Sequence, residues 1–229
     1  MKNLRLRCIT KKIISGKSLA DIGSDHAALP VYLVKNGRVP RAVASDISPG
    51  SCRRLLQTVQ ENGLQEKIDV RRGDGLQVLA PGEVTTVVIA GLGGDTIAGI
   101  LEKDWKQAES FEHFVLQPMS KAGHLRRVLA GRGWPLLQEE LVREKGRYYP
   151  VLVSRPGHHP YLLSPLEEDI GPWLLRQSGY DDYLISWLGK YRQANAALDR
   201  ARRSDKETLR TGMQVKIEEL EDWLNAGDR

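Results

Sequence analysis

One segment constrains the fold of this chain more than any other: residues 19–26, which read LADIGSDH. A short apolar run ends there in an acidic residue and a glycine, and an apolar helical pattern follows from Ala27 to Val34. This order of strand, tight turn and helix is typical of the first ligand-binding crossover of a doubly wound α/β sheet. The segment lacks the three glycines of a dinucleotide-binding turn. We therefore predict a parallel sheet whose first turn binds another kind of ligand.

The same alternation of strand and helix patterns continues to residue 154. After a basic amphipathic helix at 4–14, we expect strands at 18–22, 42–47, 68–71, 84–90 and 111–116, with helices at 26–36, 49–62, 94–101 and 122–131. Residues 134–144 and 148–154 flank Lys145-Gly146 and predict a closing antiparallel hairpin. The pattern indicates an α/β, Rossmann-like sandwich around a mostly parallel seven-stranded sheet.

The composition changes after residues 156–160, which read PGHHP, and strand patterns stop there. We place a first domain at residues 1–157 and an all-helical, coiled-coil-like domain at 160–229. Within the second domain, Pro165 opens a helix to about Gln177, and two further helices follow at 184–198 and 209–224. Ser204–Glu207 reads as a capping box, which favours an antiparallel hairpin over the alternative of one continuous helix.

Composition and charge exclude some classes of protein. The net charge of +5 is uneven, because residues 1–155 have a basic surplus and residues 156–229 an acidic one. The basic surplus of residues 1–155 favours a polyanionic partner such as nucleic acid. The alternative is that these basic residues form a well-solvated surface. Cys8 and Cys52 show no metal-ligand spacing, so we expect no metal site and a reducing, cytoplasmic setting. No apolar run reaches the roughly 18 residues of a membrane span.

Acidic and glycine-rich residues follow four successive strands of the predicted sheet. The carboxyl ends of such strands form the ligand crevice of an open α/β sheet. Carboxylates there would repel a pyrophosphate and favour a cationic nucleoside, and S-adenosylmethionine has both a sulfonium and an ammonium charge. Asp46 would accept from its ribose hydroxyls, Asp74 from its adenine amine, and Asp21 would hold its amino-acid end. The predicted cofactor-binding residues are Asp21, Gly23, Ser24, Asp46, Ile47, Asp74, Gly75 and Gly91.

Five motifs together resemble the bacterial tRNA (adenine(22)-N1)-methyltransferase family. They are DIGSDHA at 21–27, SDI at 45–47, GDGL at 73–76, IAGLGG at 89–94 and LQP at 116–118. The resemblance covers the catalytic domain, and the helical C-terminal region is also similar. It implies a class I methyltransferase fold, S-adenosylmethionine as donor, and methylation of N1 of an adenine in the D-arm of tRNA. The chain departs from the family at Leu92, where Met is usual, and at Met119, where Asn is usual.

The reaction that the resemblance implies needs no strong base, because adenine N1 carries an in-plane lone pair. The site must align and desolvate the reactants. We predict that Asp25 contacts the cofactor or tempers the moving charge. His26 would orient either partner, or it bonds backbone at the helix start. Tyr148 would stack on a flipped base or pack on the sheet. The predicted substrate-binding residues are Gly93, Gln117, Pro118, Tyr148, Arg202 and Arg203.

The C-terminal hairpin leaves two readings open. A basic cluster near its tip, which includes Arg202 and Arg203, would grip tRNA. A dimerising coiled coil is the alternative, so the protein would be a monomer or a weak homodimer. For the whole chain, the alternatives are a methyltransferase acting on another RNA or a small molecule, and a non-catalytic RNA-binding protein that retains the cofactor pocket.

Overall fold

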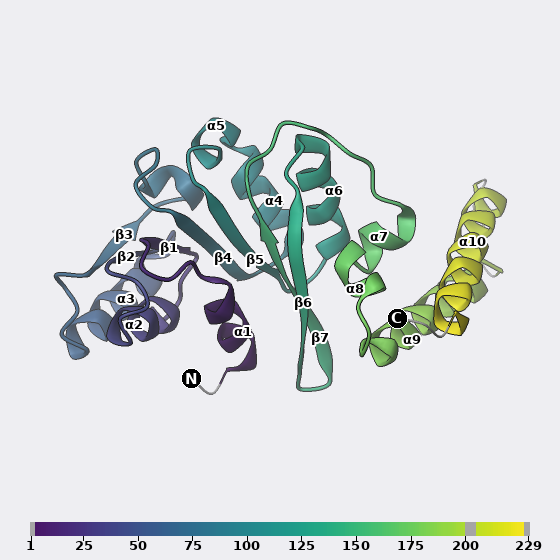
Figure 1. Cartoon of the computed structure of the whole chain (residues 1–229), viewed down its shortest axis with the longest axis horizontal. Helices are drawn as coiled ribbons and strands as arrows, with labels where there is room; N and C mark the ends of the chain where they lie inside the picture. Colours follow the sequence, from purple (N-terminus) through teal and green to yellow (C-terminus); the bar gives the residue numbers. More distant parts are fainter. Residues whose placement is uncertain (1–2, 200–204, 227–229) are drawn as a thin grey trace. The chain divides into compact units, whose positions relative to one another are not determined.

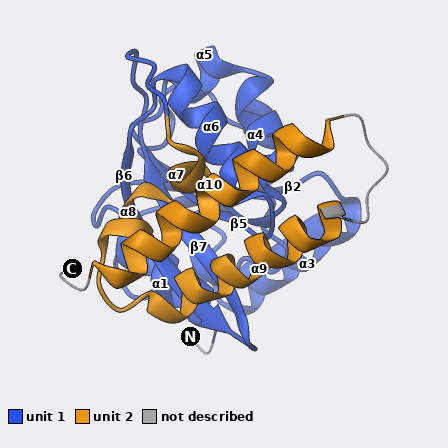
Figure 2. Ribbon diagram, turned by 90° about the vertical axis from the view of Figure 1, so that its right-hand side faces the viewer, with its two compact units in different colours: residues 1–162 blue, residues 163–229 orange. Residues whose placement is uncertain are grey.

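The computed structural model describes residues 3–199 and 205–226 (Figure 1). The chain divides into two compact units, residues 1–162 and 163–229, which Figure 2 colours blue and orange. Unit 1 contains all the strands of the described chain and unit 2 contains helices only. In the described residues, no helix combines the length and hydropathy of a membrane span.

A seven-stranded sheet forms the centre of unit 1, in the order β3-β2-β1-β4-β5-β7-β6. Its strands are β1 (Leu19–Ile22), β2 (Ala42–Asp46), β3 (Ile68–Arg72), β4 (Thr86–Leu92), β5 (His113–Pro118), β6 (Leu136–Glu144) and β7 (Arg147–Ser154). The first five strands pair in parallel, and β7 is antiparallel to both β5 and β6. The predicted mostly parallel sheet with a closing hairpin is therefore confirmed.

Successive side chains of a strand point to opposite faces of the sheet. Both faces are apolar here, and a layer of helices covers each of them. In β4, Val87 and Ile89 join one buried cluster and Val88 joins the other. The first cluster packs under α4 (Gly94–Glu102), α5 (Trp105–Ala108) and α6 (Ala122–Arg132). The second packs under α1 (Leu4–Lys12), α2 (Ala28–Lys35) and α3 (Pro49–Glu61). The layers leave the carboxyl edge of the parallel strands to the loops.

The strand order reverses between β1 and β4, which lie side by side although two strands and two helices separate them in the chain. Such a reversal opens a crevice at the carboxyl ends of the two strands. In this molecule those ends are Ile22 and Leu92. The predicted ligand turn at Gly23 therefore faces the glycine-rich end of β4.

Some predicted boundaries were wrong for local reasons. The helix expected from residue 26 begins at Ala28, because Ala27 has a left-handed backbone with φ of 50°. Asp25 and His26 therefore lie in the loop before it. Ile47, expected at the end of a strand, lies beyond β2 and is 63% exposed. The strand expected at 84–90 runs from Thr86 to Leu92 instead.

Unit 2 contains α7 (Pro165–Asp169), α8 (Pro172–Arg176), α9 (Asp181–Asp199) and α10 (Lys206–Asn225). The single helix expected from Pro165 to Gln177 is wrong, because Gly171 takes a non-helical backbone and a residue before proline disfavours the helical region. Helices α9 and α10 pair antiparallel, with Arg192 Nη2 2.6 Å from Glu221 Oε1. The predicted helix hairpin is therefore present. Ser204 of the expected capping box lies outside the described residues.

Candidate functional site

The turn after β1 surrounds a buried carboxyl group. Asp21 is only 8% exposed, and burial raises its pKa to about 6 against a partial lowering by a hydrogen bond with Ser24. Gly23 makes the turn with a φ of 74°, a conformation that L side chains rarely adopt. The Ser24 amide donates to the Ser45 carbonyl at 2.8 Å and ties the turn to β2. A cationic ligand at this turn would offset the cost of ionising Asp21.

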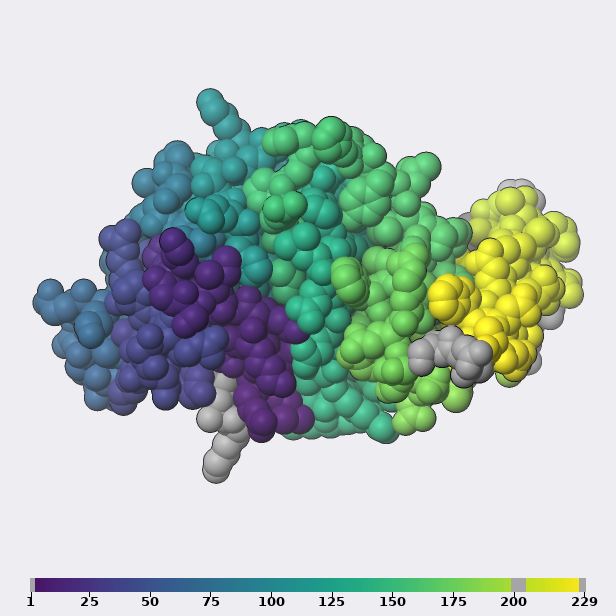
Figure 3. All heavy atoms as spheres, in the orientation of Figure 1, coloured from purple at the N-terminus to yellow at the C-terminus, as the bar shows by residue number. Residues whose placement is uncertain are grey.

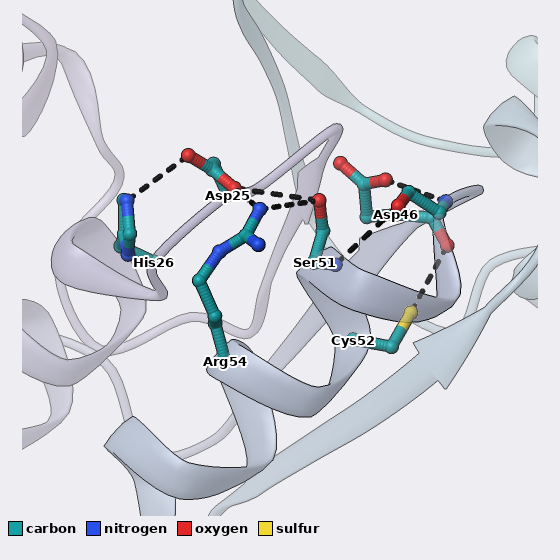
Figure 4. Close-up of polar contacts among 7 residues, drawn as sticks. Asp25, His26, Asp46, Ser51, Cys52 and Arg54 are labelled. Atoms are coloured by element: carbon teal, nitrogen blue, oxygen red, sulfur yellow. Dashed lines mark hydrogen bonds and ion pairs between the residues drawn. The ribbon is translucent and has the colours of Figure 1, made fainter.

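Asp25 lies between three polar side chains (Figure 4). It forms an ion pair with Arg54 and accepts a hydrogen bond from Ser51 Oγ at 3.3 Å, and His26 Nε2 lies 3.0 Å from its Oδ2. The hydrogen bond from Arg54 is the main reason that the pKa of Asp25 lies below its usual range. Asp25 and His26 both remain more than half exposed. Asp25 therefore acts as a fixed acceptor, since a carboxylate held ionised by a guanidinium is a poor base.

Asp46 ends β2 with one carboxylate oxygen occupied. Its Oδ1 accepts from the Ser48 amide at 2.7 Å, and its backbone carbonyl accepts from Cys52 Sγ at 3.2 Å (Figure 4). No donor among the described residues reaches the other carboxylate oxygen. Helix α3, capped by Ser48, thus fixes the orientation of Asp46 and leaves Oδ2 available to ligand hydroxyls.

Asp74 lies in the turn after β3, and Gly75 directly follows it. Asp74 Oδ2 pairs with Lys103 Nζ at 2.6 Å, and the carboxylate is about half exposed. A short 3₁₀ helix, Gly75–Val78, follows and packs toward α4, where Ile100 lies beside Gly75. Lys103 was not foreseen from the sequence, because 29 residues separate it from Asp74. The exposed carboxylate is suited to accept from an amine.

The end of β4 leaves open space beside its backbone. A register shift between Ala90 and Leu92 places Gly91 at a bulge with a φ of 80°, and a Cβ there would meet no atom within 4 Å. The Met119 amide donates to the Leu92 carbonyl at 2.7 Å, so the ends of β4 and β5 are tied together. Gly93, which caps α4, borders the same region. The bulge gives a ligand close access to the backbone between the two halves of the sheet.

The predicted substrate-binding residues differ in burial and in the contacts that hold their side chains. Gln117 is 2% exposed, and its Nε2 donates to the Pro118 carbonyl at 2.9 Å, so its amide is held locally. The Tyr148 ring is half-buried and lies under the Arg143 guanidinium, 5.4 Å from the ring centroid. Arg202 and Arg203 lie outside the described residues. Among the described residues of the set, Gln117 and Pro118 end β5, and Tyr148 lies near the start of the neighbouring strand β7.

Arg5 lies at this edge, and no sequence motif identified it as a candidate site residue. Its guanidinium lies 2.8 Å from Met119 Sδ and 4.8 Å from the centroid of the Tyr149 ring. These partners lie more than a hundred residues away in the chain, and no local motif joins them to α1. Only the fold brings the N-terminal helix to the ends of β5 and β7.

The residues at the carboxyl edge fit S-adenosylmethionine as a ligand. A buried carboxyl group with a raised pKa favours a cation, and Asp46 has an oxygen free for ribose hydroxyls. Gly91 leaves room beside the backbone for the reacting groups. Nothing in this edge resembles a pyrophosphate cradle, because Asp21, Asp46 and Asp74 surround it with negative charge.

A model of a methyltransferase domain matches residues 2–152. Over 177 residues, which are 76% of this chain and 74% of the relative, the chain is 36% identical to the tRNA (adenine(22)-N(1))-methyltransferase of Bacillus subtilis. The crystal structure of the B. subtilis M1A22 tRNA methyltransferase TrmK shares 29% identity and a TM-score of 0.85, over 96% of this chain and 97% of that one. A Streptococcus pneumoniae protein assigned to tRNA m1A22 methylation, in complex with S-adenosyl-L-methionine, shares 30% identity and a TM-score of 0.84, over 98% of this chain and all of that one. This chain belongs to the tRNA (adenine(22)-N1)-methyltransferase family.

Proposed function

We propose that the protein transfers a methyl group from S-adenosylmethionine to N1 of adenine 22 in the D-arm of tRNA. The observation that carries the proposal is the 36% identity with the B. subtilis enzyme over 76% of the chain. The acidic residues at the strand ends support it, because they fit the charge of that methyl donor. In the bacterial cell, the protein would act in the cytoplasm, where tRNA is modified.

The cofactor would lie across the ends of β1, β2 and β3. Asp21 and the turn at Gly23 and Ser24 would hold its amino-acid end, and Asp46 with Ile47 would bind the ribose. Asp74 and Gly75 would contact the adenine ring, and Gly91 would border the methyl group. When bound, the cofactor supplies an electrophilic methyl group on a sulfonium. The protein's own task is to bind and orient the reactants.

The residues around the open end of β4 would receive the target adenine. The N1 lone pair forms the new N–C bond while the sulfur–methyl bond breaks, so the positive charge moves onto the base. The fixed carboxylate of Asp25 would offset that charge, and His26 would orient the carboxylate. Gly93, Gln117 and Pro118 would shape the base pocket, and no proton need be removed before transfer.

The C-terminal unit would grip the tRNA body, with Arg202 and Arg203 as phosphate contacts. In this proposal, residues 1–157 bind the cofactor and the target base, and residues 160–229 bind the rest of the tRNA. Tyr148 would stack on the extruded base. The protein would be a monomer, or a weak homodimer through its C-terminal helices.

Methyl transfer to an unmodified tRNA transcript tests the proposal directly. The protein, labelled S-adenosylmethionine and a transcript with adenosine at position 22 should give one 1-methyladenosine, located by primer extension. A transcript with guanosine at position 22 should remain unlabelled. Label in both transcripts, or only in ribosomal RNA, would refute adenine 22 as the target.

A further inference from the structure

Arg5 connects three elements at the carboxyl edge of the sheet. Its Nε donates to Glu144 Oε2 at 2.8 Å on the β6–β7 hairpin, and its guanidinium lies over the Tyr149 ring. Its Nη1 reaches Met119 Sδ, just beyond β5. Figure 3 shows α1, in purple, directly beside the hairpin, in teal, on the same face of unit 1. The guanidinium is thus held at a defined position next to the end of β5, the strand that pairs with β4.

The hydrogen-bonding capacity of Arg5 is not used up by these contacts. Glu144 satisfies Nε, but a thioether such as that of Met119 is a weak acceptor for Nη1. No acceptor in the described part of the chain contacts Nη2. Two guanidinium donors on one edge therefore lack a strong partner, and a planar pair of this kind matches the geometry of a phosphate.

The surroundings of Arg5 favour an anion. The side chain of Arg5 is 21% exposed, so it is accessible, yet bulk water screens it less than a fully exposed cation. Further exposed basic residues lie on α1 and at the hairpin tip: Arg7, Lys11, Arg143, Lys145 and Arg147. Glu144 is the one acidic side chain of the described hairpin turn, residues 143–148, and it already pairs with Arg5.

We propose that Arg5 binds a backbone phosphate of the RNA strand that carries the target base. Glu144 and Tyr149 hold the guanidinium in place, and a phosphate oxygen displaces the weak contact with Met119. Phosphate contacts fix the register of a nucleic acid on a protein. Arg5 would in this way set the position of the strand relative to the open end of β4. The inference rests on the proposed function, since it assumes an RNA substrate at this edge.

Two substitutions at the same ion pair separate RNA binding from a structural role. Arg5→Gln removes the cation and Glu144→Gln keeps it, while both break the Arg5–Glu144 pair. Binding of the unmodified tRNA transcript is measured at several salt concentrations, with methylation kinetics and cofactor titration in parallel. Arg5→Gln should weaken tRNA binding about 10-fold and reduce the slope of log K against log salt by about 1. Glu144→Gln should leave that slope unchanged.

Cofactor affinity should stay at the wild-type value in both variants, and Arg5→Lys should recover the salt slope but only part of the affinity. Equal tRNA binding by the two Gln variants, or an unchanged slope for Arg5→Gln, would overturn the inference. If the wild-type protein fails to methylate tRNA, the proposed function falls. The salt dependence of tRNA binding still decides the role of Arg5 in that case.

Discussion

The carboxyl edge of the sheet has two halves that are built in different ways. The proposed cofactor half comprises Asp21, Gly23, Asp46 and Asp74, which lie near the carboxyl ends of β1, β2 and β3. The proposed substrate half comprises Gly93, Met119, Tyr149 and Arg5, which the fold gathers from four separate parts of the chain. Within the substrate half, Arg5 meets Met119 over 114 residues of chain. Local sequence therefore determines one half, and tertiary packing determines the other.

The comparison predicts which changes damage each half. A change that loosens the β6–β7 hairpin should act on RNA binding and leave the cofactor bound. A change at a strand end should act on the cofactor and leave RNA binding intact. Substitutions at four positions, Arg126, Asp21, Asp46 and Gly91, test that separation in order of decreasing expected effect.

The largest effect is expected at the buried ion pair that anchors β6 to α6. Arg126 Nε donates to Glu139 Oε1 at 2.7 Å, and both side chains are 0% exposed. Arg126→Met removes a cation that pairs with this buried carboxylate, and the free energy of unfolding should fall by about 3–5 kcal/mol. Arg126→Met with Glu139→Leu should recover most of that loss and keep wild-type cofactor affinity. Chemical denaturation measures the free energy of unfolding of both variants, and cofactor titration measures the affinity. A double variant as unstable as the single one would contradict the expectation.

Asp21→Asn should weaken cofactor binding and stabilise the folded protein at neutral pH. The pKa of Asp21 is raised from 3.8 to about 6, so the folded protein holds its proton more tightly than the unfolded chain does. Its contribution to stability is therefore greatest at acidic pH and is lost as the pH rises from about 4 through about 6. At neutral pH the ionised group costs about 3 kcal/mol, which the Asn variant should regain.

Denaturation of wild type and Asp21→Asn at pH 5 and pH 7 measures the change. The two proteins should differ more at pH 7 than at pH 5. Cofactor affinity of the wild type should rise with pH up to about 7, whereas that of the variant should be weaker and flat. A variant that binds the cofactor as well as wild type would remove Asp21 from the site.

The two halves also differ in how far the sequence predicted them. The acidic strand ends were found because a parallel sheet brings the carboxyl ends of its strands to one edge. The ion pairs of Asp25 and Asp74 were not predicted, since Arg54 on α3 and Lys103 at the end of α4 reach these carboxylates through packing that no motif specifies. Arg5 was missed for the same reason, because its partners meet it only after the hairpin packs on α1.

Backbone details escaped prediction where one residue decides them. The left-handed Ala27 delays α2, and the non-helical Gly171 before Pro172 divides the helix expected after Pro165. Gly91 was expected just after the strand at 84–90 but lies at a bulge within β4. Apolar periodicity identifies an element and its type, yet it does not resolve a single residue that leaves the regular conformation.

Asp46→Ala should weaken the cofactor half by a smaller amount. The substitution removes the acceptor proposed for the ribose hydroxyls, worth about 2 kcal/mol, or roughly a 30-fold rise in cofactor Kd. It also removes the bond from the Ser48 amide at the start of α3. Asp46→Asn keeps an oxygen for that amide, so it should bind the cofactor weakly without the loss of stability. Isothermal titration with cofactor and with tRNA checks the separation, which weakened tRNA binding in Asp46→Asn would contradict.

The smallest effect on stability is expected at Gly91. Because β4 pairs with both β1 and β5, Gly91 could belong to either half, and its substitution distinguishes the two assignments. Gly91→Ala places a side chain on a backbone with a φ of 80°, which should cost about 1 kcal/mol of stability. Its methyl group would project into open space, so turnover should fall further than stability does. Gly99→Ala in α4, also in open space, is the matched control and should stabilise the protein by about 0.5–1 kcal/mol.

A raised cofactor Kd in Gly91→Ala would assign Gly91 to the cofactor half, as the sequence predicts. A raised KM for tRNA at unchanged cofactor Kd would assign it to the substrate half, and wild-type kinetics would place the reacting groups away from the β4 bulge.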